Sequence, residues 1–264
     1  MSSSKSFIMP DEFLPIQLTL QSSICETTIL TPTAIQPNTL QSKLAGYPYL
    51  PKNEQPVLDD NGQPMLLLAQ LNFADIIAPK EFPTEGILQF FIAQNCYEDY
   101  TLEQANSLFS VRYYSTITSD LDISTPNYLH DANFTNFPIH YEQLLVSHTH
   151  FEPVSATDFR LAHYIDSNFL AQPFTTGGQT LHDIYFEYFL SADHKIGGYP
   201  YFIDEDIRVK NPSFYKYDTL LFQLISNDAQ SIMWGDSGVI SFFINAEKLK
   251  KRDFNDILFY AEDY

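Results

Sequence analysis

Short apolar runs recur along the sequence, and they predict strands that are covered on both faces. The clearest runs lie at Pro64–Asn72, Gly86–Ile92, Thr219–Ser226 and Ile240–Ile244. Weaker patterns, some of them with alternating apolar and polar residues, predict further strands with one solvated face. These further strands are expected at Ile16–Leu20, Thr28–Thr33, Ser110–Thr116, Gln143–Ser147 and Leu258–Ala261.

Helical patterns are fewer and shorter. Apolar residues at helical spacing predict a helix over Thr180–Leu190. Thr101 and Gln104 form a capping-box pattern that predicts a brief helix over Tyr100–Phe109, and Ala246–Lys251 is expected to form a helical turn. The sequence therefore predicts a mainly β fold with a few short helices (α+β).

Several blocks of sequence occur twice, in the same order. The block SKLAGYPYL at Ser42–Leu50 returns within HKIGGYPYFIDEDIR at His194–Arg208, and Gly46 and Gly198 are 152 residues apart (198 − 46). LLAQL returns as LLFQL, which places Gln70 and Gln223 at an offset of 153 (223 − 70). GILQFFI returns as GVISFFI at an offset of 152 (238 − 86). Repeats at a nearly constant offset indicate internal duplication.

The duplication suggests how the chain is divided. At 264 residues the chain could form one large domain or two ordinary ones, but each half holds only a few strands. One compact, roll-like body over residues 1–264, with two pseudo-equivalent halves, is therefore favoured. The first half spans about 13–110, the second about 180–264, and a connecting excursion covers 111–179.

The repeated GYPY motif combines a glycine, which permits unusual backbone angles, with a proline that keeps the preceding tyrosine extended. Because side chains alternate along extended backbone, Tyr47 and Tyr49 are expected on one face, as are Tyr199 and Tyr201 in the second copy. The motif is read as a loop that enters a short edge strand, which in the second copy covers Pro200–Ile207.

The blocks GYPYLP, LLLAQLNFADI, EGILQFF, HKIGGYPYF and WGDSGVISFFI, taken in this order, resemble the YwqG-like family of uncharacterised bacterial proteins. The resemblance covers roughly residues 40–260. It implies a mainly β, roll-like fold with internal duplication, and no established activity or cofactor. The chain departs from the family pattern at Ala45, where a second glycine is usual, and at Asp204 and Ile207 before Arg208.

The net charge of the chain limits the classes of partner that it can bind. It holds 33 acidic and 14 basic residues, a net charge of −19, which repels nucleic acid and anionic lipid. Such a surface suits either plain solubility or a basic protein partner. Cys25 and Cys96 form no metal or redox motif and indicate a reducing compartment. The sequence has no signal-peptide pattern or membrane span, so we expect a cytoplasmic protein.

The segment after the second glycine turn holds the candidates for catalysis. On an extended strand Asp204, Asp206 and Arg208 would share a face, where close carboxylates could act as acid and base or bind a hard cation. His194 could serve as general base. The alternative is a structural ion pair, and the first copy lacks these acids. Lysine, as Lys43 and Lys195, is common to both copies.

Other residues are candidates for binding. Gln70 and Gln223 are amides inside apolar strands, which either bind a ligand near the pseudo-two-fold axis or satisfy backbone groups. Trp234 and Asp236 lie in the WGDSG loop, where the tryptophan either anchors a partner or caps the core. His148 and His150 have a spacing used in metal sites, but they lack a third ligand, and we predict no metal and no cofactor.

Three hypotheses follow. The first is a non-enzymatic acidic protein that engages a basic protein partner, in the manner of an immunity or inhibitor protein acting on a toxin. The second is an enzyme, or a metal or small-molecule binder, that uses the segment around His194, Asp204, Asp206 and Arg208. The third is a small-molecule sensor lined by Tyr47, Tyr49, Tyr199 and Tyr201.

Overall fold

The computed structural model describes residues 9–52, 54–96, 107–118, 129, 132–174 and 177–264. Within this part of the chain, ten strands form one antiparallel sheet in the order β10-β9-β8-β7-β1-β6-β2-β3-β4-β5. The strands are β1 (Cys25–Thr33), β2 (Lys43–Leu44), β3 (Leu66–Asn72), β4 (Ile87–Ile92), β5 (Phe109–Tyr114), β6 (Gln143–Glu152), β7 (Lys195–Gly197), β8 (Thr219–Ile225), β9 (Val239–Ile244) and β10 (Ile257–Glu262).

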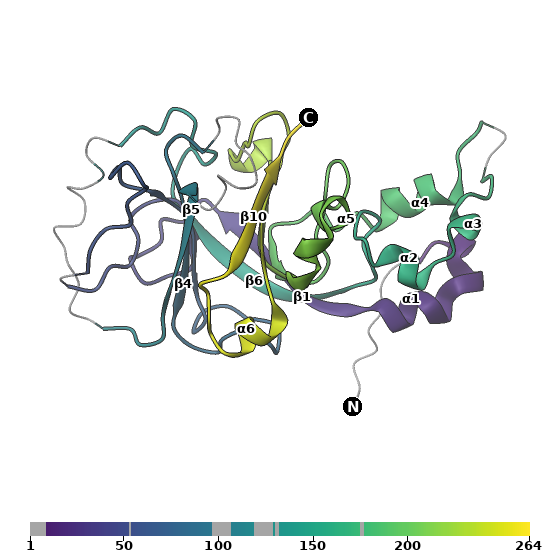
Figure 1. Cartoon of the computed structure of the whole chain (residues 1–264), viewed down its shortest axis with the longest axis horizontal. Helices are drawn as coiled ribbons and strands as arrows, with labels where there is room; N and C mark the ends of the chain where they lie inside the picture. The colour runs from purple at the N-terminus through teal and green to yellow at the C-terminus, as the bar shows by residue number, and fades with distance from the viewer. Residues whose placement is uncertain (1–8, 53, 97–106, 119–128, 130–131, 175–176) are drawn as a thin grey trace.

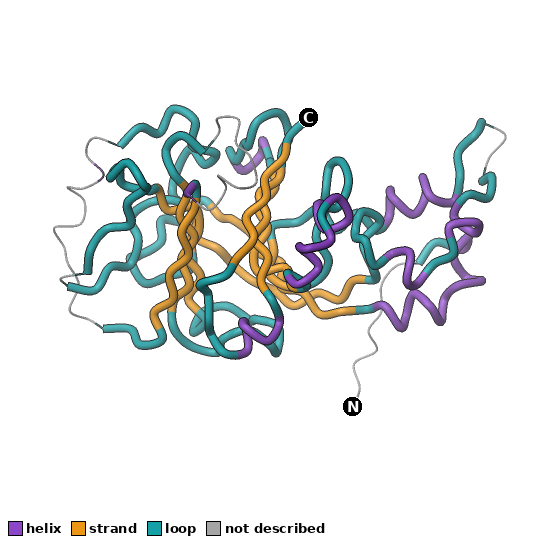
Figure 2. Tube along the Cα trace, viewed as in Figure 1, coloured by secondary structure: helices purple, strands orange, loops and turns teal. Residues whose placement is uncertain are grey.

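Short helices fill the connections (Figures 1 and 2). The α-helices are α1 (Gln17–Ser23), α2 (Leu161–Tyr164), α3 (Ser167–Leu170), α4 (Leu181–Tyr188), α5 (Ile207–Lys210) and α6 (Ala246–Lys250). Short 3-10 helices occur at η1 (Asp11–Ile16), η4 (Pro212–Lys216) and η5 (Asp228–Gln230). The mainly β class with a few short helices is confirmed.

The strand order is symmetric about its centre. The strands β2 to β5 of the first half lie on one side, β7 to β10 of the second half lie on the other, and β1 and β6 pair between them over nine residues. The two halves also share a detail of register, because the pairing slips between Leu67 and Ala69 in β3 and between Leu220 and Phe222 in β8. The segment expected to connect the halves thus supplies a central strand, β6.

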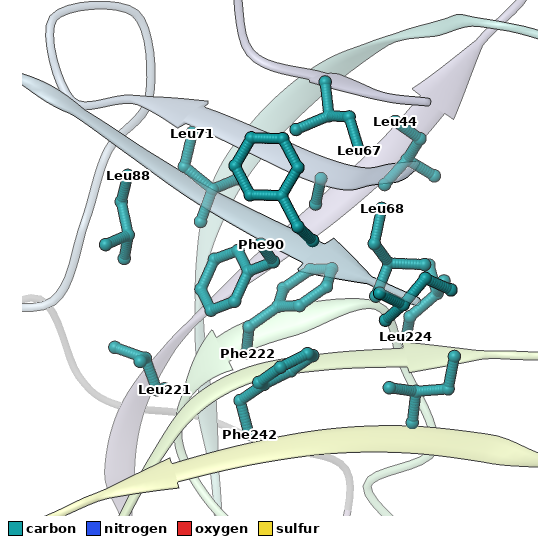
Figure 3. Packing of buried hydrophobic residues seen from close by; sticks show 14 of the residues in the cluster. Leu44, Leu67, Leu68, Leu71, Leu88, Phe90, Leu221, Phe222, Leu224 and Phe242 are labelled. Atoms are coloured by element: carbon teal, nitrogen blue, oxygen red, sulfur yellow. The ribbon is translucent and has the colours of Figure 1, made fainter. Parts of the chain in front are cut away.

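The sheet curls into a nearly closed barrel. Its two edge strands approach one another, since Phe109 of β5 stacks on Phe259 of β10 with ring centroids 5.4 Å apart. Inside, Phe90 of the first half packs 4.8 Å from Phe222 and 4.9 Å from Phe242 of the second half (Figure 3). Every residue of β3, β4 and β9 is buried, which explains why these strands are continuous apolar runs.

A helical lobe, made of η1 and α1 to α4, stands at one end of the barrel, where β1 and β6 project from it (Figure 1). It has its own core, in which the ring of Phe13 packs on Tyr185 at 5.4 Å and on Phe189 at 6.0 Å. A capping box begins α4, since Thr180 accepts from the Asp183 N–H and the Asp183 carboxylate accepts from the Thr180 N–H. The predicted helix at Thr180–Leu190 is therefore confirmed.

Two predicted strands are wrong. Ile16–Leu20 is the end of η1 and the start of α1, where the helix buries Leu20 and leaves Leu18 82% exposed. Pro200–Ile207 is a loop that ends where Asp206 caps α5, because its carboxylate accepts the Arg208 N–H. Of the helix predicted at Tyr100–Phe109, residues 100–106 lie outside the described part of the chain, and Phe109 begins β5.

Candidate functional site

Each copy of the repeated motif buries one lysine against a glutamate at an end of β6. Lys43 Nζ lies 2.8 Å from Glu142 Oε1, just before the strand, and Lys195 Nζ lies 2.9 and 3.0 Å from the two oxygens of Glu152, its last residue. Burial lowers the pKa of Lys43, although Glu142 opposes this. The lysine common to both copies is therefore an internal ion-pair partner.

The glycine of the motif makes room for that glutamate. Gly46 and Gly198 have φ of +76° and +72°, in the left-handed region that favours glycine. A Cβ at either position would collide with the carboxylate of Glu142 or Glu152. Glu152 Oε1 also accepts the Tyr199 N–H at 2.7 Å. The K-x-x-G-Y pattern is thus explained by packing around a buried carboxylate.

Gln70 is fully buried and bonded to the backbone on several sides. Its Oε1 accepts the Tyr49 N–H at 2.7 Å, and its Nε2 donates to the carbonyls of Thr39 and Gln41 at 2.9 and 3.0 Å. These bonds tie the GYPY loop to β3. The same oxygen accepts from Gln89 Nε2 at 2.8 Å.

Gln223 repeats this arrangement in the second half. Its Oε1 accepts the Tyr201 N–H at 2.8 Å, and its Nε2 donates to the carbonyls of Ser191 and Asp193 at 3.1 and 3.0 Å. Both amides therefore satisfy the backbone of a loop that would otherwise have buried, unpaired polar groups.

His194 is buried, and both of its ring nitrogens are occupied. Nδ1 accepts the Ile225 N–H at 3.2 Å, so Nε2 carries the proton and donates to Gln230 Oε1 at 2.8 Å. Burial lowers the pKa of His194, and the bond to Gln230 only partly offsets this. The geometry requires the neutral ring.

We therefore predict that stability depends on pH through His194. Because its pKa is lower in the folded state, the unfolded chain gains protons first as the pH falls below about 6.5, and folding is weakened by about 1 kcal/mol between pH 7 and 5.5. His194→Gln cannot titrate and should lose this contribution to the slope. Urea unfolding at both pH values checks it, and equal slopes for the two proteins would contradict it.

Asp204, Asp206 and Arg208 do not share a strand face, because the backbone turns into α5. The Asp204 side chain is 76% exposed and pairs with Lys210 Nζ at 2.6 Å. Asp206 is buried and binds Arg208 through both carboxylate oxygens, at 2.9 and 2.7 Å. The ring of His194 bonds to Gln230 and to the Ile225 backbone, and to none of these three residues among those described.

Arg208 belongs to a closed network of ions. Its Nη2 also lies 3.0 Å from Asp158 Oδ2, and Arg160 binds the same carboxylate at 2.6 and 2.7 Å. Burial alone would raise the pKa of Asp158, but the two guanidinium groups outweigh it and hold the pKa below its ordinary value. The positive charges of the two arginines balance the negative charges of the two aspartates, which is typical of a structural network.

The tyrosines of the motif do not form one surface. Tyr49 is fully buried whereas Tyr47 is 47% exposed, so the expectation of a shared face in the first copy is wrong. Tyr199 and Tyr201 are both buried, and Tyr199 donates its hydroxyl to the Ser23 carbonyl at 2.6 Å. Trp234 is 5% exposed and belongs to the barrel core, while Asp236 in the same loop is exposed.

The end of β10 lies beside the loop that leads to α5 (Figure 1), and acidic residues of both segments come together there. Glu262 Oε1 accepts the Ile203 N–H at 2.7 Å, and Asp263 Oδ2 accepts the Asp236 N–H at 3.3 Å. Burial raises the pKa of Glu262. We name this region the acidic patch, and its members are Asp204, Glu205, Asp236, Glu262 and Asp263.

Within the described part of the chain, no group of three or more His, Cys, Asp or Glu residues could hold a metal ion. His148 and His150 are exposed neighbours on one face of β6.

No described helix is long and apolar enough to cross a membrane.

The structure also contains partners that the sequence did not single out. Glu142, Glu152 and Asp158 are lone acids in the sequence, and only the pairing of distant segments makes them partners of buried cations. A pocket between α2, α3 and α4 was missed as well. The apolar spacing of residues 161–170 was its available signal.

A family model described as "Domain of unknown function (DUF1963)" matches residues 42–262. This range includes both copies of each repeated block. No curated protein matches the chain.

Proposed function

We propose that this chain, which belongs to the DUF1963 family, is a non-enzymatic binding protein whose acidic patch engages a basic protein partner. The observation that carries the proposal is where the charged side chains lie. Lys43, Lys195 and Arg208 are buried in internal pairs, while Asp204, Glu205 and Asp236 face solvent at the end of β10. Each of these cations is paired with an acid, so the net charge of −19 stays on the surface that a partner meets.

The state of the catalytic candidates supports binding over catalysis. A general base must reach the proton it removes, and a buried neutral ring with both nitrogens bonded is poorly placed for that task. His194 has this arrangement, and Arg208 is enclosed by its own carboxylates. An immunity-type or inhibitor-type role, in which acidic groups cover a basic protein, fits these features.

We also propose a cytoplasmic location and an origin by internal duplication. Cys25 and Cys96 are free, and burial raises the pKa of both thiols to about 12, as suits unreactive thiols in a reducing compartment. The matching roles of Gln70 and Gln223 support the duplication. The sequence blocks alone support a YwqG-like protein of bacterial origin.

The acidic patch can be tested by charge neutralisation. We expect Asp204→Asn, Glu205→Gln and Asp263→Asn, combined, to weaken binding of the captured basic partner about tenfold or more at low salt, mostly by slowing association. Affinity capture from cell lysate at low and high salt identifies the partner, and association rates measured with the purified partner give the magnitude. Native mass spectrometry would show any other bound molecule.

The matched control neutralises three exposed acids elsewhere, namely Asp60→Asn, Glu85→Gln and Glu187→Gln. It carries the same net charge, so an equal loss in both variants would mean that total charge and not the patch recruits the partner. Failure to retain any basic protein at low salt would count against the function itself.

A further inference from the structure

The helical lobe contains a pocket of about 450 Å³ between α2, α3 and α4. Its apolar lining includes Leu161, Ile165 and Leu170, of which the last two are buried in the core of the lobe. Two alanines, Ala162 and Ala171, also line it, and both are still exposed to solvent. Small side chains at these two positions leave the space open.

The size and lining of this pocket suit a small molecule. Sites for small ligands typically enclose about 300–1,000 Å³, with mostly apolar walls and a few polar groups that set orientation. Here the polar groups are those of Ser167, Thr180 and His182, at the starts of α3 and α4. The apolar body of a ligand can therefore contact the leucine and isoleucine side chains while its polar end faces these residues.

The charge beside these polar groups favours a cation. Asp183 Oδ2 accepts from Thr180 Oγ1 at 2.9 Å, which places its carboxylate next to a lining residue. Hydrogen bonds from the Thr180 backbone and side chain lower the pKa of Asp183, so it stays ionised at neutral pH. Asp166, the N-cap of α3, directly precedes Ser167. Among the described lining residues, His182 is the only basic one. The two nearby carboxylates and the net charge of −19 therefore disfavour an anion.

We propose that this pocket binds a small amphiphilic cation, with its apolar body on Leu161, Ile165 and Leu170 and its ammonium group facing Asp166 and Asp183. This site is separate from the acidic patch, and the proposal does not depend on the protein partner. The pocket would give the protein a small-molecule input in addition to its binding surface.

Three probes of nearly equal shape test the charge preference: 4-phenylbutylamine, 4-phenylbutan-1-ol and 4-phenylbutanoate. We expect the amine to bind best and the carboxylate about tenfold more weakly or worse, by calorimetry and by ligand-dependent shifts in thermal unfolding of the full chain. Tighter binding of the carboxylate would overturn the cation assignment. No binding of any probe at millimolar concentration would overturn the site.

Variants that fill the pocket test its location. Ala162→Leu and Ala171→Leu extend side chains that are already exposed, so folding should be kept, and amine affinity should fall at least tenfold. The matched control Ala74→Leu, at an exposed alanine outside the pocket, should bind as the unaltered chain does. Equal affinity in all three variants would place the amine elsewhere. Dimers that are lost in Ala162→Leu would mean that a second copy covers the pocket, and the proposal would be wrong.

Discussion

Replacing Arg208 by methionine is expected to lower the free energy of unfolding by about 3–5 kcal/mol, because it leaves buried carboxylate without its counter-ion. Asp206 is 2% exposed and loses both of its bonds to the guanidinium, at 2.9 and 2.7 Å. Methionine restores much of the volume, so the loss reports charge and not a cavity. Chemical denaturation at neutral pH measures it.

The aromatic surroundings add to the expected loss. The guanidinium carbon of Arg208 lies 4.7 Å from the ring centre of Phe159 and 5.1 Å from that of Phe243, within the range of cation–π attraction. Arg208 is fully buried among these rings, so water cannot solvate the carboxylate that loses its counter-ion. Methionine keeps contact with the rings but not the electrostatic attraction.

Two further variants separate the contributions. Adding Asp206→Asn to Arg208→Met removes the orphaned charge and should recover part of the stability. The amide oxygen can still accept one of the two backbone N–H groups, those of Phe159 and of position 208, that the two carboxylate oxygens accept in the unaltered chain. Arg160→Met should cost less, about 1–3 kcal/mol, because Asp158 keeps its bond to Arg208. If the double variant were no more stable than Arg208→Met, the buried charge would not be the cause.

Much of the barrel could be predicted from the sequence because burial on both faces leaves a direct mark. The strands β3, β4, β8 and β9 are apolar runs, and their predicted positions differ from the observed ones by at most two residues at either end. Constant offset between repeated blocks also anticipated that Gln70 and Gln223 would have equivalent surroundings. Both signals are local, or compare one segment with another in the same sequence.

The failures have local causes that compete with these signals. The segment Ile16–Leu20 alternates like a strand, but Ile16 and Leu20 are also one helical turn apart, and the helix leaves Leu18 in solvent. In the second copy of the motif Asp206 is an N-cap, a role that its carboxylate fills through the Arg208 N–H. Capping of α5 by Asp206 therefore explains why the extended strand predicted for this segment does not form.

The candidate site was less predictable because its contacts are distant in sequence. Glu152 and Lys195 are 43 residues apart and Lys43 and Glu142 are 99 apart, so neither pair follows from local spacing. The acidic patch likewise joins the loop before α5, the WGDSG loop and the end of β10. Only the pairing of strands in the barrel brings such segments together, and this pairing could not be predicted from a single sequence.

The duplicated motif offers a matched comparison for the second prediction. We expect Lys195→Met to lower the free energy of unfolding by about 3–5 kcal/mol, since Glu152 is 5% exposed and loses both Nζ contacts. Lys43→Met makes the same change at the equivalent position of the first half. There the Glu142 side chain is 17% exposed and also accepts from Gln36 Nε2, so water and the amide relieve the lost charge.

We therefore expect Lys43→Met to cost about 1–2 kcal/mol, clearly less than Lys195→Met in parallel urea titrations. Adding Glu152→Gln to Lys195→Met should restore part of the loss, because the amide oxygen can still accept the Tyr199 N–H. Equal losses at the two lysines would show that the shared motif, and not the burial of each glutamate, sets the energy.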